Sequence, residues 1–418
     1  IVGGFIATLL GGWDSALATL VVFMGIDFVT GIMTAAMGKS KHSESGTLNS
    51  TAGWVGLAKK FCILLMVIVT LLLFGLIMLF SASSPRALDS GNIYSVILKQ
   101  GALAIIGCAG MFLTANFDYH RYKKMSRLIM LGTLVIMYIV PIIGFASHGA
   151  TRQISIGPIS FQPSELAKFS LVIYFASRFS TRQTADLQHD TKNVMKCVGV
   201  VALYIGACAL QSHMSAAVVL AGISLMMMIA AGLPLKYLYW VGAAGVAGFA
   251  FMAMESYRLD RFRALFNPFK YRKGIGWQII QSLYAVGSGG LFGLGLGQSR
   301  QKYLYLPEAH NDYIYAIVCE ELGFVGAVAV IALFVLFVWR GMSIALKAKD
   351  KLGTLMAFGI TSIVGVQMLI NIGVVLSVLP STGMQLPFFS SGGTSLIVML
   401  TGMGILLNIS RTSKIKKM

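Results

Sequence analysis

Apolar stretches of about 20 residues recur along this 418-residue chain, and each is long enough to cross a hydrocarbon core of about 30 Å as an α-helix. A transmembrane barrel would instead alternate apolar and polar residues, and the sequence does not show that pattern. The chain is 56% hydrophobic and only 11% charged, whereas an ordinary soluble domain is about 25% charged. The sequence therefore predicts an all-α, polytopic helical membrane protein.

The apolar stretches divide the chain into two unequal parts, which we expect to be an amino-terminal membrane segment, 1–60, and a main membrane domain, 61–418. The first part holds apolar pieces at 1–12 and 15–37, followed by a polar linker from Gly38 to Trp54. In the second part we expect ten spans, at 61–82, 94–115, 127–147, 165–179, 196–211, 215–231, 236–254, 313–340, 355–378 and 393–409.

Lysine and arginine in the short loops predict the orientation. If the ten spans alternate, four basic segments fall on one side, namely 118–127, 177–196, 339–351 and the tail 410–418. The positive-inside rule makes that side the cytoplasm. These loops explain much of the net charge of +18, so we expect a membrane and no nucleic acid as partner. The outer side then holds 83–93, 148–164, 255–312 and 379–392.

The long outer segment 255–312 departs from this rule because it is net positive. One interpretation is a solvated loop that crossed the membrane despite its charge. The other is a surface that attracts an anion, such as the phosphate of a lipid headgroup, with interleaved aromatic residues lying in the membrane interface. The basic residues that we expect to bind such an anion are Arg258, Arg261, Arg263, Lys270, Arg272 and Lys273.

Asp312 directly precedes the span that begins at Tyr313. It is either a cap that favours the helix dipole or a reactive carboxylate at the outer membrane surface. Glu308 and His310 are its neighbours, and partial burial would raise its pKa toward a value useful for a general base.

Two further carboxylates, Glu320 and Glu321, lie inside the same span, about 12 Å deeper at 1.5 Å per residue. Placing a carboxylate within a membrane span costs free energy, so such residues are candidates for function. Helical periodicity places Glu320 about 80° around from Asp312, so we expect it to line the same cavity. Glu321 points the opposite way, and we expect it to pair with a basic group on another helix.

A second intramembrane pair occurs in "FQPSELAKFS". Pro163 suits a helix start, Ser164 is a possible cap, and Glu165 and Lys168 share one helix face. They form either a self-neutralising pair or part of a site, and Arg152 precedes them on the outer side.

Two segments rich in glycine or turn residues complete the outer face. "GSGGLFGLGLGQ" (287–298), which ends at Gln298, predicts close packing or a lid more than a phosphate nest. "LPSTGMQLPFFSSGGTS" (379–395), which includes Ser391, predicts a broken segment that is buried in protein or lines a cavity. The five cysteines lack metal-ligand spacing, and we expect them to be free thiols. These features are compatible with an enzyme acting on a phosphate-bearing lipid and with a transporter moving one.

From about residue 66 onward the chain resembles the SEDS family of shape, elongation, division and sporulation proteins (FtsW, RodA and SpoVE). The motifs that carry the resemblance are "LIMLFSAS", "IGPISFQPSELAKFS", "NPFKYRKGIGWQIIQSLYAVGSGGLFGLGLGQSRQKYLYLPEAHNDYIYAIVCEELGFVG" and "LPSTGMQLPFFSSGGTSL". The motifs "LPEAHNDYIY" and "QSHMSAAVV" resemble the FtsW and SpoVE branch more closely than RodA. Many RodA-type members have Pro-Asp-Leu-Gly where this chain has Ser212-His213-Met214-Ser215, so no role of that aspartate is carried over.

The resemblance implies a ten-span peptidoglycan glycosyltransferase, acting in cell division or sporulation, that polymerises lipid II with a class B penicillin-binding protein. Its essential outer-loop aspartate matches Asp312, which implies a catalytic base. The resemblance favours the enzyme over the alternative function, a lipid II flippase. We expect the enzyme to form a β-1,4 link with inversion and to release undecaprenyl diphosphate. The substrate would be bound by the basic residues given above together with Glu308, His310 and Gln298. A divalent cation, Mg²⁺ or Mn²⁺, is a candidate ligand of Asp312. The cavity would be shaped by Arg152, Glu165, Lys168, Glu320, Glu321 and Ser391.

The first 60 residues depart from this family. "LGGWDSALATLVVFMGIDFVTGIMTAAMGKSK", followed by "GWVGLAKK", is similar to small phage-type holins of the toxin-secretion and lysis class. Holins form membrane lesions, so this resemblance implies a pore as a second alternative for residues 1–60. The simpler interpretation is an extra membrane anchor.

Overall fold

The computed structural model describes residues 50–89, 92–143, 145–147, 150–156, 159–181, 191–233, 239, 242, 256–303 and 305–412. The expected apolar pieces 1–12 and 15–37, and almost all of the expected span 236–254, lie outside these residues. The helices that build the bundle are α3 (Ser50–Asp89), α4 (Ser95–Asn116), α5 (His120–Ile143), α6 (Pro163–Ser180), α8 (Thr191–Leu210), α9 (Met214–Ala230), α13 (Ile314–Lys347), α14 (Lys351–Val375) and α15 (Thr394–Thr412).

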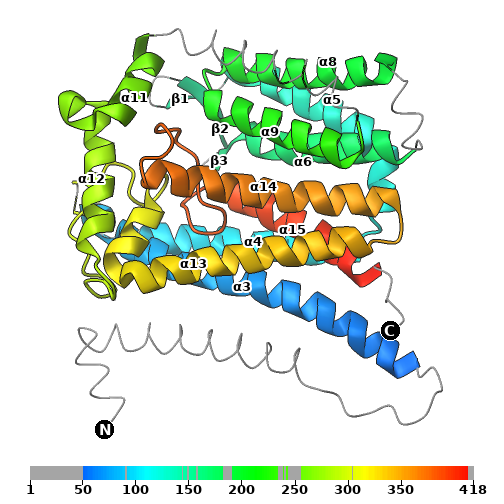
Figure 1. Ribbon diagram of the computed structural model, residues 1–418, viewed down its shortest axis with the longest axis horizontal. Helices are drawn as coiled ribbons and strands as arrows, with labels where there is room; N and C mark the ends of the chain where they lie inside the picture. Colours follow the sequence, from blue (N-terminus) through cyan, green and yellow to red (C-terminus); the bar gives the residue numbers. More distant parts are fainter. Residues whose placement is uncertain are drawn as a thin grey trace.

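These helices match the expected spans that fall on described residues, and they lie side by side along the bundle (Figure 1). Two expected ends are wrong: residues 145–147 of the span 127–147 form a strand, and α14 ends at Val375, before residue 378. Six of the helices in the described part are long and apolar enough to cross a membrane, namely α3 over Phe61–Pro85, α4, α5, α13, α14 and α15. Val194–Leu210 and Met214–Ala230 are shorter apolar helices. α6 carries three charged residues, and the bundle tolerates them because α6 is buried among α5, α9 and α14.

The predicted boundary between residues 60 and 61 falls inside α3, which continues unbroken across it. α3 is 40 residues long, or about 60 Å at 1.5 Å per residue, so it extends well beyond a hydrocarbon core of about 30 Å. It packs on α13 and α15. At Gly75 an added Cβ would lie 2.3 Å from the carbonyl oxygen of Phe388, so only glycine allows this close approach of the two backbones.

A small antiparallel sheet, which the sequence analysis did not predict, occupies one end of the bundle. Its strands are β1 (Phe145–Ser147), β2 (Ala150–Ile156) and β3 (Ile159–Phe161), in the order β1-β2-β3. Ile154 pairs with Phe161 and Ile156 with Ile159. The sheet connects α5 to α6, so the expected outer loop 148–164 is in large part a hairpin.

The predicted cytoplasmic segments do meet at one end of the bundle, on the right in Figure 1. The Tyr119 hydroxyl donates a hydrogen bond of 2.6 Å to Asp350, and the Tyr119 backbone N–H donates to Asn408 Oδ1 at 3.2 Å. The Ser177 hydroxyl donates to the carbonyl of Lys123 at 3.2 Å. These contacts join residues in or beside all four basic segments, which confirms that the segments share a side.

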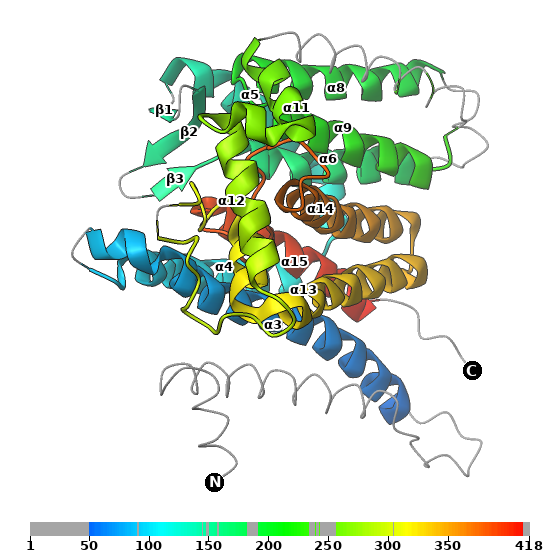
Figure 2. The ribbon, with the colours of Figure 1, turned by 60° about the vertical axis from the view of Figure 1, so that its left-hand side comes forward.

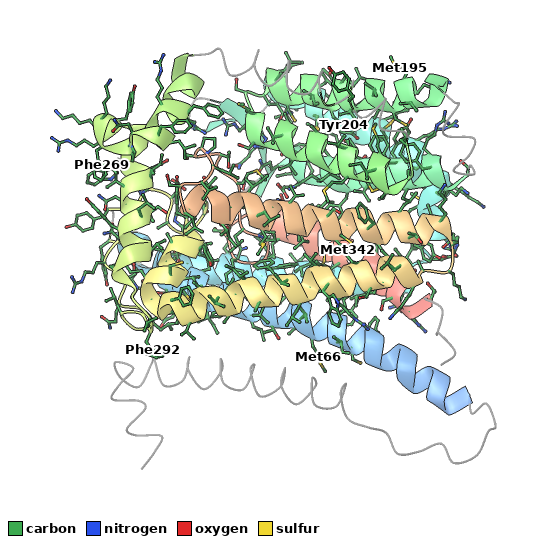
Figure 3. All side chains as sticks on the ribbon, viewed as in Figure 1. Met66, Met195, Tyr204, Phe269, Phe292 and Met342 are labelled. Carbon is green, nitrogen blue, oxygen red and sulfur yellow. The ribbon has the colours of Figure 1, made fainter. Side chains whose placement is uncertain are left out.

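The opposite end is covered by helical elements where the sequence analysis expected a long loop. They are α11 (Ser256–Phe266), the short 3₁₀ helix η1 (Pro268–Tyr271) and α12 (Ile275–Ser288), and Figure 2 shows α11 and α12 crossing this end. Phe266 and Phe269 on this cover are 86% and 61% exposed, and Figure 3 shows Phe269 pointing away from the bundle. This arrangement agrees with an aromatic-rich segment lying in a membrane interface.

α13 changes direction at Gly323, where φ is 67° and ψ is −165°. The break allows the backbone N–H groups of Leu294 and Gly295 to donate to the carbonyls of Glu320 and Glu321, both at 3.0 Å. An added Cβ at Gly293 would lie 2.1 Å from the Glu321 carbonyl oxygen. The glycine-rich segment 287–298 therefore packs closely against α13, as the sequence analysis favoured.

Candidate functional site

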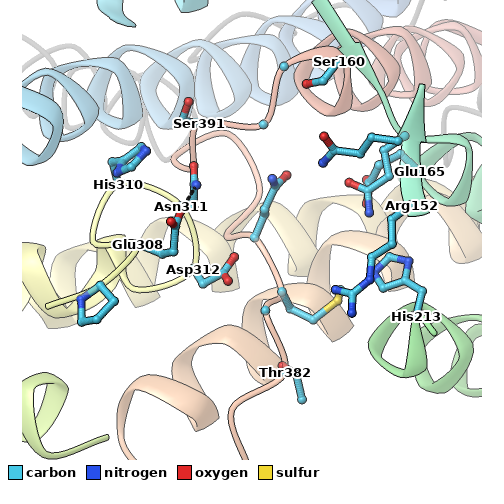
Figure 4. Close-up of a pocket in the computed structure, with 18 of the residues that line it drawn as sticks. Arg152, Ser160, Glu165, His213, Glu308, His310, Asn311, Asp312, Thr382 and Ser391 are labelled. Carbon is cyan, nitrogen blue, oxygen red and sulfur yellow. Dashed lines mark hydrogen bonds between the residues drawn. The ribbon is translucent and has the colours of Figure 1, made fainter. Parts of the chain in front are cut away.

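A cavity of about 870 Å³ opens at the covered end of the bundle. Its wall comes from α4, β2, β3, α6, α9, α11, α12, the turn before α13 and the irregular segment 376–393. Eight residues from the sequence-predicted set line it: Arg152, Glu165, Lys168, Arg261, Glu308, His310, Asp312 and Ser391. The tertiary fold thus brings together residues that are far apart in the sequence, as Figure 4 shows.

Asp312 lies in the turn that leads into α13, with its carboxylate in the cavity. Its backbone N–H donates to the Glu308 carbonyl at 3.2 Å, and its own carbonyl accepts from Asn371 Nδ2 at 2.8 Å. Asn371, on α14, also donates to the Met384 carbonyl at 2.6 Å. One amide therefore fixes both the turn that carries Asp312 and the irregular segment facing it.

The irregular segment 376–393 lines the cavity with residues 381–385 and 391–393, and residues 386–390 between them are buried, which confirms the interpretation of "LPSTGMQLPFFSSGGTS". Gly383 has φ 67°, and a Cβ added there would lie 3.2 Å from an Asp312 carboxylate oxygen. Glycine thus keeps space open beside the carboxylate. The Ser391 N–H donates to the His310 carbonyl at 3.0 Å, which joins the far end of the segment to the same turn.

Burial raises the pKa of Asp312 to about 7, with a further contribution from the negative charge of Glu308. Arg261 and Arg152 act in the opposite direction and limit the rise. The carboxylate remains partly accessible from the cavity although protein surrounds it on most sides. A group with this pKa exchanges a proton near neutral pH, as a general base must.

Of the basic residues predicted to bind an anion, Arg261 lines the cavity, and its Nη1 donates to the Ser381 carbonyl at 2.7 Å. The others with described side chains lie on the exposed surface of the cover and do not line the cavity. They are Arg263, Lys270, Arg272 and Lys273. The Arg258 side chain lies outside the described residues. Their role in binding substrate stays a prediction, and their position also suits contact with membrane headgroups.

Glu165 and Lys168 form the expected pair on α6, with Lys168 Nζ 2.7 Å from Glu165 Oε2. Both side chains are buried at the cavity wall. α6 begins at Pro163, as predicted, but the expected cap is wrong. Gln162 occupies the N-cap position, and the buried Ser164 hydroxyl makes no hydrogen bond.

The expectation that Glu320 lines the cavity is also wrong. α13 begins at Ile314, so Asp312 is not in helical phase with Glu320, and the angle of about 80° does not apply. Glu320 instead accepts hydrogen bonds from the Ser299 hydroxyl and from the backbone N–H groups of Arg300 (3.0 Å) and Gln301 (3.3 Å).

Glu321 pairs with a basic group, as expected, although that group is on a loop rather than on another helix. Lys302 Nζ lies 3.0 Å from Glu321 Oε1, and the Ser81 hydroxyl of α3 donates to the same carboxylate. All three side chains are buried. Glu320 and Glu321 therefore attach the loop that leads to Asp312 onto α13 and α3. Gln298, in contrast, is exposed and does not line the cavity.

Among the described residues, no group of three or more His, Cys, Asp and Glu side chains is arranged to hold a metal ion. The five cysteines are free, as expected. Asp312 and Glu308 still place two carboxylates at one wall of the cavity. Magnesium is often bound through one or two carboxylates together with substrate phosphates, so these two residues fit a cation that arrives with a diphosphate.

Several residues of the site were not predicted from the sequence: His213, Thr382 and Gly383, which line the cavity, and Asn371, which holds the turn that carries Asp312. His213 and Asn371 each interrupt a predominantly apolar run, which is the signal that could have identified them. Arg152, on β2, donates from Nη2 to the Ser212 carbonyl at 3.1 Å. That contact holds the strand against the turn that carries His213.

Comparison with known proteins gives two family matches. The profile of the FtsW, RodA and SpoVE family, described as "Cell cycle protein", matches residues 62–415. The profile described as "Bacteriophage holin family" matches residues 4–102. The two overlap over 62–102, so the holin-like region reaches past the predicted boundary at residue 60, through the rest of α3 and into α4.

Individual relatives match over most of their length. The chain is 40% identical over 359 residues to stage V sporulation protein E of Bacillus subtilis, covering 84% of this chain and 97% of the relative. It is 38% identical over 352 residues to a probable peptidoglycan glycosyltransferase FtsW of a Geobacter species, covering 83% and 96%.

Solved structures share the fold. A chain of a peptidoglycan synthase complex, described for its coordination of polymerisation and crosslinking, aligns with a TM-score of 0.69 at 25% identity, covering 83% of this chain and 96% of that one. The rod shape determining protein RodA of Thermus thermophilus aligns with a TM-score of 0.62 at 25% identity, covering 83% and 95%.

Proposed function

Because the chain belongs to the FtsW, RodA and SpoVE family of cell cycle proteins, we propose that it is a peptidoglycan glycosyltransferase that polymerises lipid II in the cavity around Asp312. The observation that carries this proposal is a cavity-facing carboxylate whose pKa is raised to about 7, with Arg261 on the same cavity. One relative is named for sporulation and the other as a probable peptidoglycan glycosyltransferase, and the proposed chemistry serves cell division or sporulation alike.

Asp312 is the general base of the proposed reaction. The 4-hydroxyl of the acceptor sugar attacks the anomeric carbon of the donor sugar, and its proton passes to the Asp312 carboxylate. The bond between that carbon and the diphosphate breaks, and the electron pair leaves with undecaprenyl diphosphate. An α-linked donor becomes a β-1,4 link, so a single displacement with inversion is sufficient and no covalent intermediate is needed.

The leaving diphosphate needs charge stabilisation more than protonation, because it is already a weak base. Arg261 is suited to this role because it faces the cavity and is held by Ser381. A divalent cation held by Asp312 and Glu308 would neutralise additional phosphate charge when bound. His310 lies between these two carboxylates in sequence and lines the same wall.

The pH dependence of polymerisation follows from the state of Asp312. The base acts as a carboxylate, so turnover should rise as the pH increases through about 7 and level off above it. Glu308→Gln removes the negative charge that helps to raise this pKa, so the acid limb should move to lower pH. The measurement is kcat against pH with purified protein and lipid II.

Asp118→Asn is the matched control, because it removes an exposed carboxylate at the opposite end of the bundle. Its profile should coincide with that of the unchanged protein. An acid limb that stays in place in Glu308→Gln, or moves to higher pH, would show that Asp312 is not the group being titrated.

We also propose a membrane location and a protein partner. We expect the cavity to face the outside of a bacterial cytoplasmic membrane, since the basic segments lie at the other end of the bundle. We also expect a class B penicillin-binding protein to crosslink the strands, because a solved relative is part of a complex that polymerises and crosslinks.

The function is tested with purified protein, its transpeptidase partner and labelled lipid II. Glycan strands that grow with time would support the proposed enzyme. Translocation of lipid II across liposome membranes without strand formation would replace it with the flippase.

A further inference from the structure

His213 occupies the turn between α8 and α9, on the wall of the cavity across from Asp312 (Figure 4). Its backbone N–H donates to the Cys208 carbonyl at 2.8 Å, and its own carbonyl accepts from Ala217 at 3.3 Å. The residue is only 5% exposed, so its ring has little freedom to turn elsewhere. The fold thus holds an imidazole at a defined place in the cavity.

The ring is a buried polar group that the protein itself does not satisfy. Nδ1 is sealed from solvent and has no hydrogen-bond partner. Because His213 nonetheless lines the cavity, the ring edge that carries Nε2 is the part that a ligand can reach. Nε2 makes no hydrogen bond within the described part of the protein either, but it is not sealed. Buried polar groups are nearly always paired, so an imidazole that presents an unpaired Nε2 to a cavity points to a ligand that pairs this nitrogen.

The neutral state of the His213 ring suits an uncharged ligand group. Burial lowers the pKa of His213 to about 3, and Arg152 and Lys168 contribute to the decrease. The ring is therefore neutral at physiological pH. Lys168 is neutralised by Glu165 at 2.7 Å, and Arg152 donates to the Ser212 carbonyl.

We propose that His213 recognises an uncharged hydroxyl or amide of the sugar part of the lipid-linked substrate, on the wall opposite the catalytic base. This inference rests on the proposed function. The sugar would then bind at the wall formed by α6, α9 and β2, and the diphosphate would bind near Arg261. His213 is then a residue that determines specificity and takes no part in proton transfer.

The test compares three substitutions that separate the two ring nitrogens. His213→Gln places an amide near the position of Nε2, His213→Asn places one near Nδ1, and His213→Leu provides neither. Binding of lipid II and of undecaprenyl diphosphate, which lacks the sugars, is measured for each protein in nanodiscs. Thermal unfolding reports whether each variant is folded.

We expect His213→Leu and His213→Asn to weaken lipid II binding about three- to tenfold, the loss of one neutral hydrogen bond, and to leave undecaprenyl diphosphate binding unchanged. His213→Gln should retain most of the lipid II affinity. Arg261→Gln serves as the contrasting variant, because it should weaken binding of both compounds.

Equal loss for both compounds in folded His213→Leu would overturn the assignment of the sugar to this wall. Unchanged lipid II binding in the same variant would overturn the role of His213 itself. A failure of the unsubstituted protein to bind either compound would instead refute the proposed function, and the inference with it.

Discussion

Asp312→Asn should reduce glycan-strand synthesis by about 10²- to 10⁴-fold, the usual contribution of a positioned general base. The amide keeps the size of the side chain but cannot accept the proton of the attacking hydroxyl. The turn is held through the backbone of residue 312, whose N–H donates to the Glu308 carbonyl and whose carbonyl accepts from the Asn371 side chain, so the local structure should survive the change. The measurement is strand length and yield from labelled lipid II, beside thermal unfolding of the same preparation.

The matched control is Asp350→Asn, which changes a carboxylate at the other end of the bundle. It should leave the chemical step unchanged, because the amide oxygen can still cap α14 and accept from the Tyr119 hydroxyl. Full polymerisation by folded Asp312→Asn would remove Asp312 from the mechanism and reduce the cavity to a binding surface.

Lys302→Met should destabilise the protein by about 3–5 kcal/mol, because it leaves the buried carboxylate of Glu321 without its cation. Ser81 and the Ser299 N–H would still donate to that carboxylate, but neither carries a charge. The measurement is the free energy of unfolding in mixed micelles. Polymerisation should fall as well, because this pair attaches the loop that leads to Asp312.

A double-mutant cycle separates the ion pair from general packing. Lys302→Met combined with Glu321→Gln should be less destabilised than Lys302→Met alone, since no uncompensated charge remains buried. Lys273→Met, on the exposed cover, should change stability by less than about 0.5 kcal/mol. If Lys302→Met were as mild as Lys273→Met, the buried pair would not be what holds this loop.

The helices were largely predictable because a membrane span is a local property of the sequence. An apolar run of sufficient length forms a helix whatever its neighbours are, since lipid offers its backbone no other hydrogen-bond partner. The position of Asp312 just before α13 and the pairing of Glu165 with Lys168 are local for the same reason. Each depends only on spacing along one helix.

The arrangement of the site depended on contacts between distant segments, which spacing does not encode. Glu320 was assigned to the cavity by helical phase, yet the turn before α13 and the break at Gly323 direct it to the backbone of Arg300 and Gln301. Among the lysine and arginine residues of 255–312 with described side chains, Arg261 alone lines the cavity, because the others lie on the outer surface of the cover or in the loop that follows it.

The sequence by itself determined that this chain is a membrane-embedded helical bundle with a carboxylate at the start of α13, because hydrophobic length and residue order are sufficient for both. Only the tertiary structure decided that Asp312 meets Asn371 and Gly383, and that His213 faces it across a cavity. Those neighbours come from α14, the segment 376–393 and the turn before α9. They approach one another only when the helices pack, and this packing also buries Asp312 and raises its pKa.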